Sequence, residues 1–199
     1  MILLRYVLLA LVLVFFVISL VATLPLPLYS QKIRDYNQDG EVIVSMWFIS
    51  VGEVTLTGEN ATVTPTSLPV RVNYAGCEDF RATFRSLQAF SIGGTVFGFY
   101  AVLLSSLQSF FRLKVKLPLF LFILLATLCE LLSVLVAGIA HSKEFCTNVD
   151  GSTNVTPVVF KNAGYRLSSS FTLHVVALVG YFSCLLITPF TQQLWCGKR

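Results

Sequence analysis

Long apolar stretches without charge alternate along this chain with shorter polar segments. Apart from Arg5 at the start of the first stretch, Glu130 is the only charged residue within them. A helix of about 20 residues crosses the hydrocarbon core of a membrane and satisfies its own backbone there. The pattern therefore predicts an α-helical membrane protein, a bundle of transmembrane helices at residues 5–27, 87–109, 117–140 and 168–190.

The first stretch has a second interpretation, a cleaved signal peptide, because Arg5 precedes an apolar run that ends before Pro25 and Pro27. The apolar core of a signal peptide usually has about 7 to 15 residues, and this run is longer. We therefore expect a retained helix. Either interpretation leaves the topology of the downstream spans unchanged.

Charge predicts the orientation of these helices. Three segments are expected in the cytosol, the N-terminus 1–4, the loop 110–116 and the tail 191–199, and none of them holds an acidic residue. An excess of Lys and Arg marks cytosolic loops. The basic residues in or beside these segments are Arg5, Arg112, Lys114, Lys116, Lys198 and Arg199.

Both termini are accordingly expected in the cytosol of a multi-pass protein of the plasma membrane, with segments 28–86 and 141–167 outside. The formal net charge of +4 is then a topology signal, and no nucleic-acid partner is expected. The basic cytosolic loop favours contact with anionic membrane lipids, worth about 1 kcal/mol per residue near the surface.

The first outer segment, 28–86, is rich in β-branched and aromatic residues between Gly and Pro. This composition predicts a small extracellular β-sheet. The expected strands are Val42–Val51, Glu53–Thr57 and Pro69–Tyr74, with turns at Asn37–Gly40, at Gly52 and at Gly58–Asn60. A sheet of two or three strands is marginal alone, so we expect it to pack on helix ends or on a partner.

Candidate modification sites lie in the outer segments and at the C-terminus. Asn60 and Asn154 each begin an Asn-x-Thr glycosylation sequon. Cys77 and Cys146 are the cysteines outside the membrane, so they form a candidate disulfide in an oxidising compartment. Cys196 stands next to the membrane and is a candidate palmitoylation site, with an unmodified thiol as the alternative.

Glu130 lies near the middle of a predicted helix, where an ionised side chain costs about 3 kcal/mol. His174 on the next helix is expected at a similar depth, so we predict an intramembrane polar pair. One hypothesis is a proton-linked or ligand-binding site; the other, which we favour, is an interhelical hydrogen bond with Glu130 uncharged. A pathway would need further polar residues, and the sequence indicates only Thr127, Ser133 and Thr172.

Small residues on the second helix, Ala89, Gly93, Gly94 and Gly98, predict close packing against another helix. That helix belongs either to the same chain, which we favour, or to a second copy in a homo-oligomer.

Motifs that carry enzyme chemistry are absent from the sequence. It has no His-Glu-x-x-His, Gly-x-Ser-x-Gly or Cys-x-x-Cys pattern and no Gly-rich phosphate loop. With 2 histidines, a His-rich metal site is excluded. We expect no catalytic residues, no metal site and no cofactor.

The layout of the chain resembles the claudin-like tetraspan group, and within it the amastins, surface glycoproteins of kinetoplastid parasites. Phe80–Arg81 and Arg85–Ile92 look like that family's Arg and Ala-Phe-x-Ile stretch, and Gly164–Phe171 is similar to its approach to the fourth helix. The family's first-loop signature has paired cysteines around a Leu-Trp-Gly-like core. Here Trp47 and Gly52 are loosely similar, and Cys77 is the only cysteine of that loop.

The resemblance implies a non-enzymatic surface glycoprotein that contacts an extracellular or host-surface partner, or organises the membrane, through its outer loops. The alternative function is a transporter or channel subunit that uses Glu130 and His174.

Overall fold

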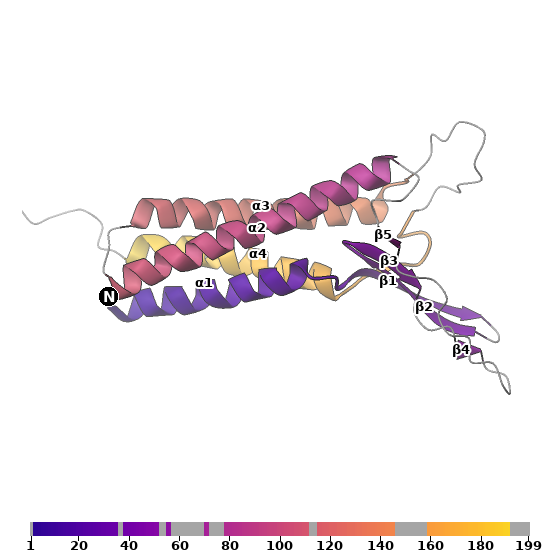
Figure 1. The fold of residues 1–199 in the computed structure, drawn as a ribbon, viewed down its shortest axis with the longest axis horizontal. Helices are drawn as coiled ribbons and strands as arrows, with labels where there is room; N and C mark the ends of the chain where they lie inside the picture. Colours follow the sequence, from indigo (N-terminus) through magenta and orange to yellow (C-terminus); the bar gives the residue numbers. More distant parts are fainter. Residues whose placement is uncertain are drawn as a thin grey trace, which may run out of the picture. The chain divides into compact units, whose positions relative to one another are not determined.

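The fold consists of four long helices and a small antiparallel sheet (Figure 1). The structure, a computed structural model, describes residues 2–35, 38–51, 55–56, 70–71, 78–111, 115–145 and 159–191. The helices are α1 (Ile2–Thr23), α2 (Glu78–Phe110), α3 (Lys116–Ser142) and α4 (Ser169–Ile187), and a 3₁₀ turn, η2 (Thr188–Thr191), follows α4. All four helices are long and apolar enough to span a membrane, which confirms the predicted fold class.

The chain divides into two compact units. The helical unit comprises Met1–Thr23, Phe90–Ser133 and Leu173–Arg199, and the sheet unit comprises Leu24–Ala89 and Val134–Thr172. Helices α2, α3 and α4 each contribute residues to both units, whereas α1 belongs to the helical unit alone.

The first helix ends earlier than the predicted boundary at residue 27. Leu24 already lies outside α1, and strand β1 begins at Pro27. Proline lacks a backbone N–H and disfavours helical geometry in the residue before it, so Pro25 and Pro27 stop the helix. At the other end of the chain, α4 gives way to η2 next to Pro189 for the same reason.

The second helix begins at Glu78 instead of residue 87, so the end of the predicted outer loop is helical. Phe80, Phe84 and Leu87 are buried, at the spacing of one helix face. Glu78 and Asp79 occupy the first turn, where negative charge interacts favourably with the helix dipole. The part of α2 before residue 87 is amphipathic. The prediction looked for uncharged stretches, so the charged residues of this part left it out.

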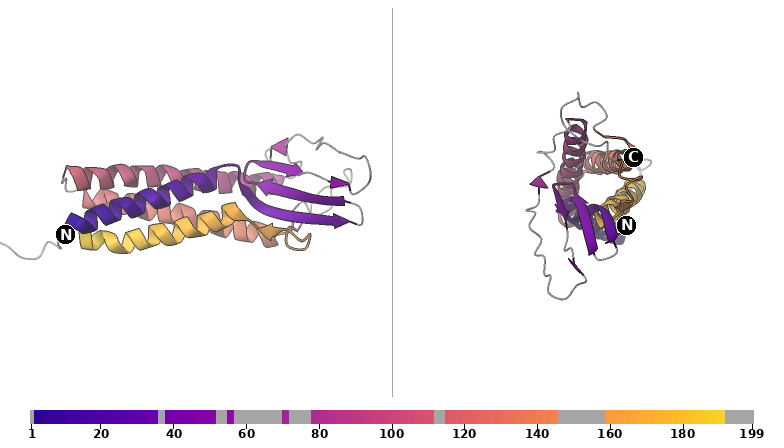
Figure 2. Two further views of the ribbon diagram at one scale, coloured as in Figure 1. Left: turned by 90° about the horizontal axis from the view of Figure 1, so that it is seen from below. Right: turned by 90° about the vertical axis from the view of Figure 1, so that its right-hand side faces the viewer.

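The strands form one sheet in the order β5-β3-β2-β1-β6, with β4 paired to β2. Figure 2 shows β1, β2 and β3 side by side as an antiparallel meander. The strand bounds are β1 Pro27–Asp35, β2 Gln38–Ser45, β3 Phe48–Val51, β4 Thr55–Leu56, β5 Val70–Arg71 and β6 Arg166–Leu167.

Two strands were not predicted. Strand β1 follows the first helix directly, in residues that the sequence analysis divided between the span and the loop. Strand β6 comes from the second connecting segment and pairs Leu167 with Tyr29 and Arg166 with Ser30. The sheet therefore contains residues of both segments, whereas the prediction placed it in the first one alone.

The predicted strand Val42–Val51 is interrupted by a tight turn at Met46 and Trp47. The hydroxyl oxygen of Ser45 accepts hydrogen bonds from the backbone N–H groups of Trp47, at 3.3 Å, and Phe48, at 2.8 Å. A serine that bonds to backbone two and three residues ahead stabilises such a turn. The predicted turn at Asn37–Gly40 is also wrong in part, because Asp39 and Gly40 pair within β2.

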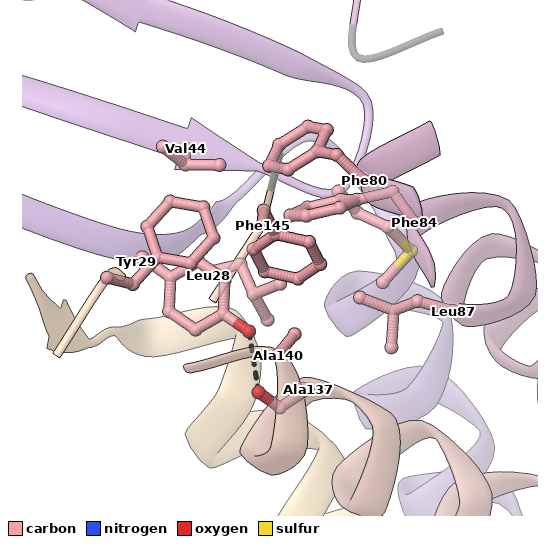
Figure 3. Packing of buried hydrophobic residues seen from close by; sticks show 11 residues of the cluster. Leu28, Tyr29, Val44, Phe80, Phe84, Leu87, Ala137, Ala140 and Phe145 are labelled. Carbon is pink, nitrogen blue, oxygen red and sulfur yellow. Dashed lines mark hydrogen bonds between the residues drawn. The ribbon is translucent and has the colours of Figure 1, made fainter. Parts of the chain in front are cut away.

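Aromatic side chains form the core of the sheet unit. The rings of Phe80 and Phe84 stack at 4.5 Å, and those of Tyr29 and Phe160 stack at 4.8 Å. The Tyr29 hydroxyl donates a hydrogen bond to the Ala137 carbonyl oxygen at 2.6 Å (Figure 3). Burial of the phenol raises the pKa of Tyr29, because the charged form would lose its hydration. The hydroxyl is therefore a stable donor that ties β1 to α3 within this unit.

A β-bulge explains why two consecutive residues of β1 enter this core. The register of β1 against β2 shifts between Pro27 and Tyr29, so Leu28 is the extra residue. Both Leu28 and Tyr29 are fully buried, although successive side chains of a regular strand point to opposite faces.

The helical unit has two apolar clusters of its own. One is formed by Leu8, Val12, Ala101, Leu119, Ile123 and Cys184, and the other by Ala126, Ala177 and Tyr181.

Candidate functional site

Glu130 and His174 are in direct contact inside the helical unit. The Glu130 Oε2 and His174 Nδ1 atoms lie 2.7 Å apart, and the two side chains are 0% and 2% exposed. Glu130 belongs to α3 and His174 to α4. The pair that the sequence analysis singled out is thus brought together by the fold.

Hydroxyl groups from the other two helices complete a closed ring of hydrogen bonds around this pair. Ser19 Oγ donates to Glu130 Oε1 at 2.5 Å, and Ser91 Oγ lies 3.4 Å from His174 Nε2. The remaining contacts are Ser19–Thr95 at 3.3 Å, Thr95–Thr23 at 3.0 Å and Thr23–Ser91 at 2.9 Å. We call these side chains the polar ring: Ser19, Thr23, Ser91, Thr95, Glu130 and His174.

Each hydroxyl pair of the ring is spaced four residues apart on one helix. Ser19 and Thr23 lie on α1, and Ser91 and Thr95 lie on α2. Side chains four apart share a helix face, so each pair presents both hydroxyls to the same neighbours. The spacing indicates that the hydroxyls of each pair share a face, but only the packing of the helices shows that this face meets Glu130 and His174.

The polar residues that the sequence analysis named instead have other surroundings. The Thr127 hydroxyl donates to the Ile123 carbonyl oxygen of its own helix, and that of Thr172 donates to the Ser168 carbonyl oxygen in the sheet unit. Ser133 is buried in the helical unit, and its hydroxyl has no hydrogen-bond partner among the described residues. None of these three residues belongs to the polar ring.

Glycines of α2 make room for the side chains that reach this region. A Cβ atom at Gly94 would lie 2.8 Å from Glu130 Oε1, and one at Gly93 would lie 3.3 Å from Cys129 Sγ. A Cβ atom at Gly98 would overlap the Tyr181 hydroxyl. Gly93, Gly94 and Gly98 therefore pack inside the helical unit, whereas Ala89 is exposed on the sheet unit.

The chemistry available to the polar ring is hydrogen bonding and proton binding. A carboxyl group and an imidazole can share or exchange a proton, and the hydroxyls can each donate one hydrogen bond. Within the described ranges, no group of three or more His, Cys, Asp or Glu side chains is placed to hold a metal ion.

Several predicted site residues lie outside the described part of the chain. They are the sequon residues Asn60 and Asn154, the disulfide candidates Cys77 and Cys146, and the palmitoylation candidate Cys196. Their modification stays a prediction.

The fold defines the class of this protein, a four-helix membrane-spanning protein with a small antiparallel sheet. Comparison with known families narrows the class. The family model for the amastin surface glycoproteins matches residues 13–186, which is most of the chain. The chain therefore belongs to the amastin surface glycoprotein family, as its layout indicated despite the departure in the first-loop cysteines. No curated protein matches it.

Proposed function

We propose that this chain is a non-enzymatic surface protein of the plasma membrane whose sheet unit lies outside the cell and contacts a partner there. One observation carries the proposal: both segments that connect the spans contribute to a single sheet with its own aromatic core. A connection that served only to join helices would not need a buried core. The connecting segments thus form a folded surface, although spanning the membrane does not require them to fold.

The orientation of the sheet unit follows from charge. All of the predicted cytosolic segments are basic or uncharged, and the acidic residues other than Glu130 lie in the connecting segments. The positive-inside rule then favours an outer sheet unit. Its exposed charged side chains include Lys143, Glu144, Lys161 and Arg166. Such a mixed surface suits a polar protein or glycan partner better than insertion into lipid.

The test uses the whole protein in lipid nanodiscs, applied to a panel of cell surfaces and to protein-free vesicles. We expect saturable binding to cells and none to the vesicles. Binding should weaken at least about tenfold, equivalent to 1.4 kcal/mol, when Phe84→Ala disrupts the core of the sheet unit.

Two matched variants are controls for this experiment. Thr83→Ala, next to Phe84 in the chain, removes a hydroxyl that donates to the Asp79 carbonyl oxygen of its own helix. Glu130→Gln alters the polar ring of the helical unit. Both should bind cells like the wild type. Equal binding by wild type, Phe84→Ala and empty nanodiscs would contradict the proposal.

The second candidate function is a transporter or channel subunit, and the buried Glu130–His174 contact is the observation that favours it. It predicts a proton-coupled flux in reconstituted vesicles that Glu130→Gln abolishes. The first proposal predicts that the wild type and this variant give the same flux as vesicles without protein.

A further inference from the structure

Tyr100 on α2 carries a polar group on the outer surface of the helical unit. Its side chain is 46% exposed, and its ring packs against Phe99 of the same helix and, at 5.3 Å, against Phe122 of α3. Within the described ranges its hydroxyl makes no hydrogen bond. On a helix that spans a membrane, this hydroxyl is therefore left among the lipid chains.

The depth of Tyr100 keeps its hydroxyl away from the lipid headgroups. Along the helix, Tyr100 is about 20 Å from residue 87 and about 14 Å from residue 109, the two ends of the predicted span. Side chains on a helix point back toward its N-terminus, and in α2 this direction leads away from the nearer end of the span. The hydroxyl therefore lies in the hydrocarbon core, where it needs a hydrogen-bond acceptor.

Tyr6 shows the ordinary arrangement of a lipid-facing tyrosine. It is 44% exposed, and it lies near the N-terminus of α1, next to Arg5. Its side chain points toward that end of the helix, so its hydroxyl reaches the membrane surface, where tyrosines are common. The same explanation does not apply to Tyr100.

A second copy of this chain supplies an acceptor at the depth of Tyr100. The polar groups of membrane lipids lie at the two surfaces, whereas the same residue of a second copy in the same orientation lies at the same depth. Val96, Tyr100, Leu103 and Leu107 are all exposed and follow one another at spacings of four, three and four residues. This is the spacing of a coiled-coil seam, in which one polar residue fixes the register of two parallel helices.

The glycines of α2 do not provide this surface. Gly94 lies against Glu130 of the same chain, and Gly98 lies against Tyr181. Both glycines are buried, whereas Tyr100 belongs to the exposed side of the helix. A second copy would therefore meet α2 on the side of Tyr100.

We infer that two copies of this chain pair through the exposed face of α2, with the two Tyr100 hydroxyls hydrogen-bonded to each other at the two-fold axis. One hydroxyl donates and the other accepts. Val96, Leu103 and Leu107 of both copies pack around this bond. A shift of one α2 along the other separates the two hydroxyls, so the bond also fixes the register of the pair.

The experiment is fluorescence energy transfer between donor-labelled and acceptor-labelled copies of the full chain in lipid vesicles, at decreasing protein density. For the wild type we expect transfer that saturates with density and falls when unlabelled chain is added. Tyr100→Phe removes the hydroxyl and keeps the ring. Its association constant should be about threefold to thirtyfold lower, the range for one hydrogen bond between membrane helices.

Two results of this measurement would overturn the inference. One is a wild-type chain that stays monomeric at every density, as expected if the hydroxyl of Tyr100 bonded to a lipid-soluble molecule instead. The other is equal association of the wild type and Tyr100→Phe.

Matched variants test whether the effect is specific to this face. Tyr6→Phe also removes a lipid-facing hydroxyl, and it should associate like the wild type. Leu103→Ala shortens a side chain of the seam, whereas Leu186→Ala shortens an exposed leucine of α4. Only Leu103→Ala should weaken association. Equal losses in Tyr6→Phe and Tyr100→Phe, or in the two leucine variants, would contradict a pair formed through α2.

Discussion

Phe84→Ala is expected to lower the free energy of unfolding of the sheet unit by about 3–5 kcal/mol, the usual cost of deleting a buried phenylalanine. Phe84 is 0% exposed, and its ring stacks on Phe80 at 4.5 Å. A cavity at this position removes contacts with residues from both connecting segments, because the Phe160 ring also lies 6.5 Å from the Phe84 ring. Hydrogen exchange should show the loss first in the amides of β1 and β2.

Phe84→Leu and Thr83→Ala calibrate this prediction. Leucine restores part of the lost volume, so its cost should be smaller than that of alanine. Thr83→Ala removes a partly exposed side chain of the same helix turn and should change stability by less than about 0.5 kcal/mol. If Phe84→Ala matched Thr83→Ala, the aromatic core would not hold the sheet unit together.

Glu130→Lys is expected to cost about 3 kcal/mol or more, while Glu130→Gln should cost about 0.6 kcal/mol or less. Glutamine keeps an acceptor for Ser19, and its amide N–H can donate to His174 Nδ1. Lysine brings a charge into the bundle and removes the acceptor of Ser19. Unfolding in mixed micelles and the amount of protein at the cell surface measure both variants.

The glutamine variant also separates a structural role of Glu130 from a functional one. With a structural role, Glu130→Gln folds, reaches the surface and keeps every activity of the wild type. A loss of activity with normal folding would show that proton exchange at Glu130 serves a function. Severe unfolding of Glu130→Gln would contradict the hydrogen-bond account itself.

The sequence predicted the helices well, because a membrane span must be apolar along its length. It missed the start of α2 since Glu78 and Asp79 are charged, although Phe80, Phe84 and Leu87 already follow the spacing of a helix face. A membrane span must be apolar along its whole length, whereas an amphipathic extension needs apolar residues on one face only. The sequence pattern of a span and that of an amphipathic helix therefore have to be searched for separately.

The strands were harder to predict than the helices. Strand β6 has two residues, too few for a periodic pattern, and it is defined by its pairing with Tyr29 and Ser30 from the other segment. The strand propensity of these two residues does not show which residues they pair with. The turn after Ser45 had a local signal, a serine before the turn, but the β-branched residues on both sides concealed it.

The candidate site was predictable in part. Counting depth along antiparallel helices placed Glu130 near His174. The hydroxyls of Ser19 and Ser91 could not be assigned to them, because serine in a membrane helix commonly bonds to its own backbone. Only the packing of the helices shows which hydroxyls face the pair.

The most direct test of the central claim, a four-span surface protein with an outer sheet unit, is the accessibility of tags in intact cells. Tags after Lys114 and after Arg199 should be detected only once the membrane is permeabilised, and a tag after Asn154 should be detected without it. Detection of the Lys114 or Arg199 tag in intact cells would contradict the proposed topology, as would a tag after Asn154 that stays hidden.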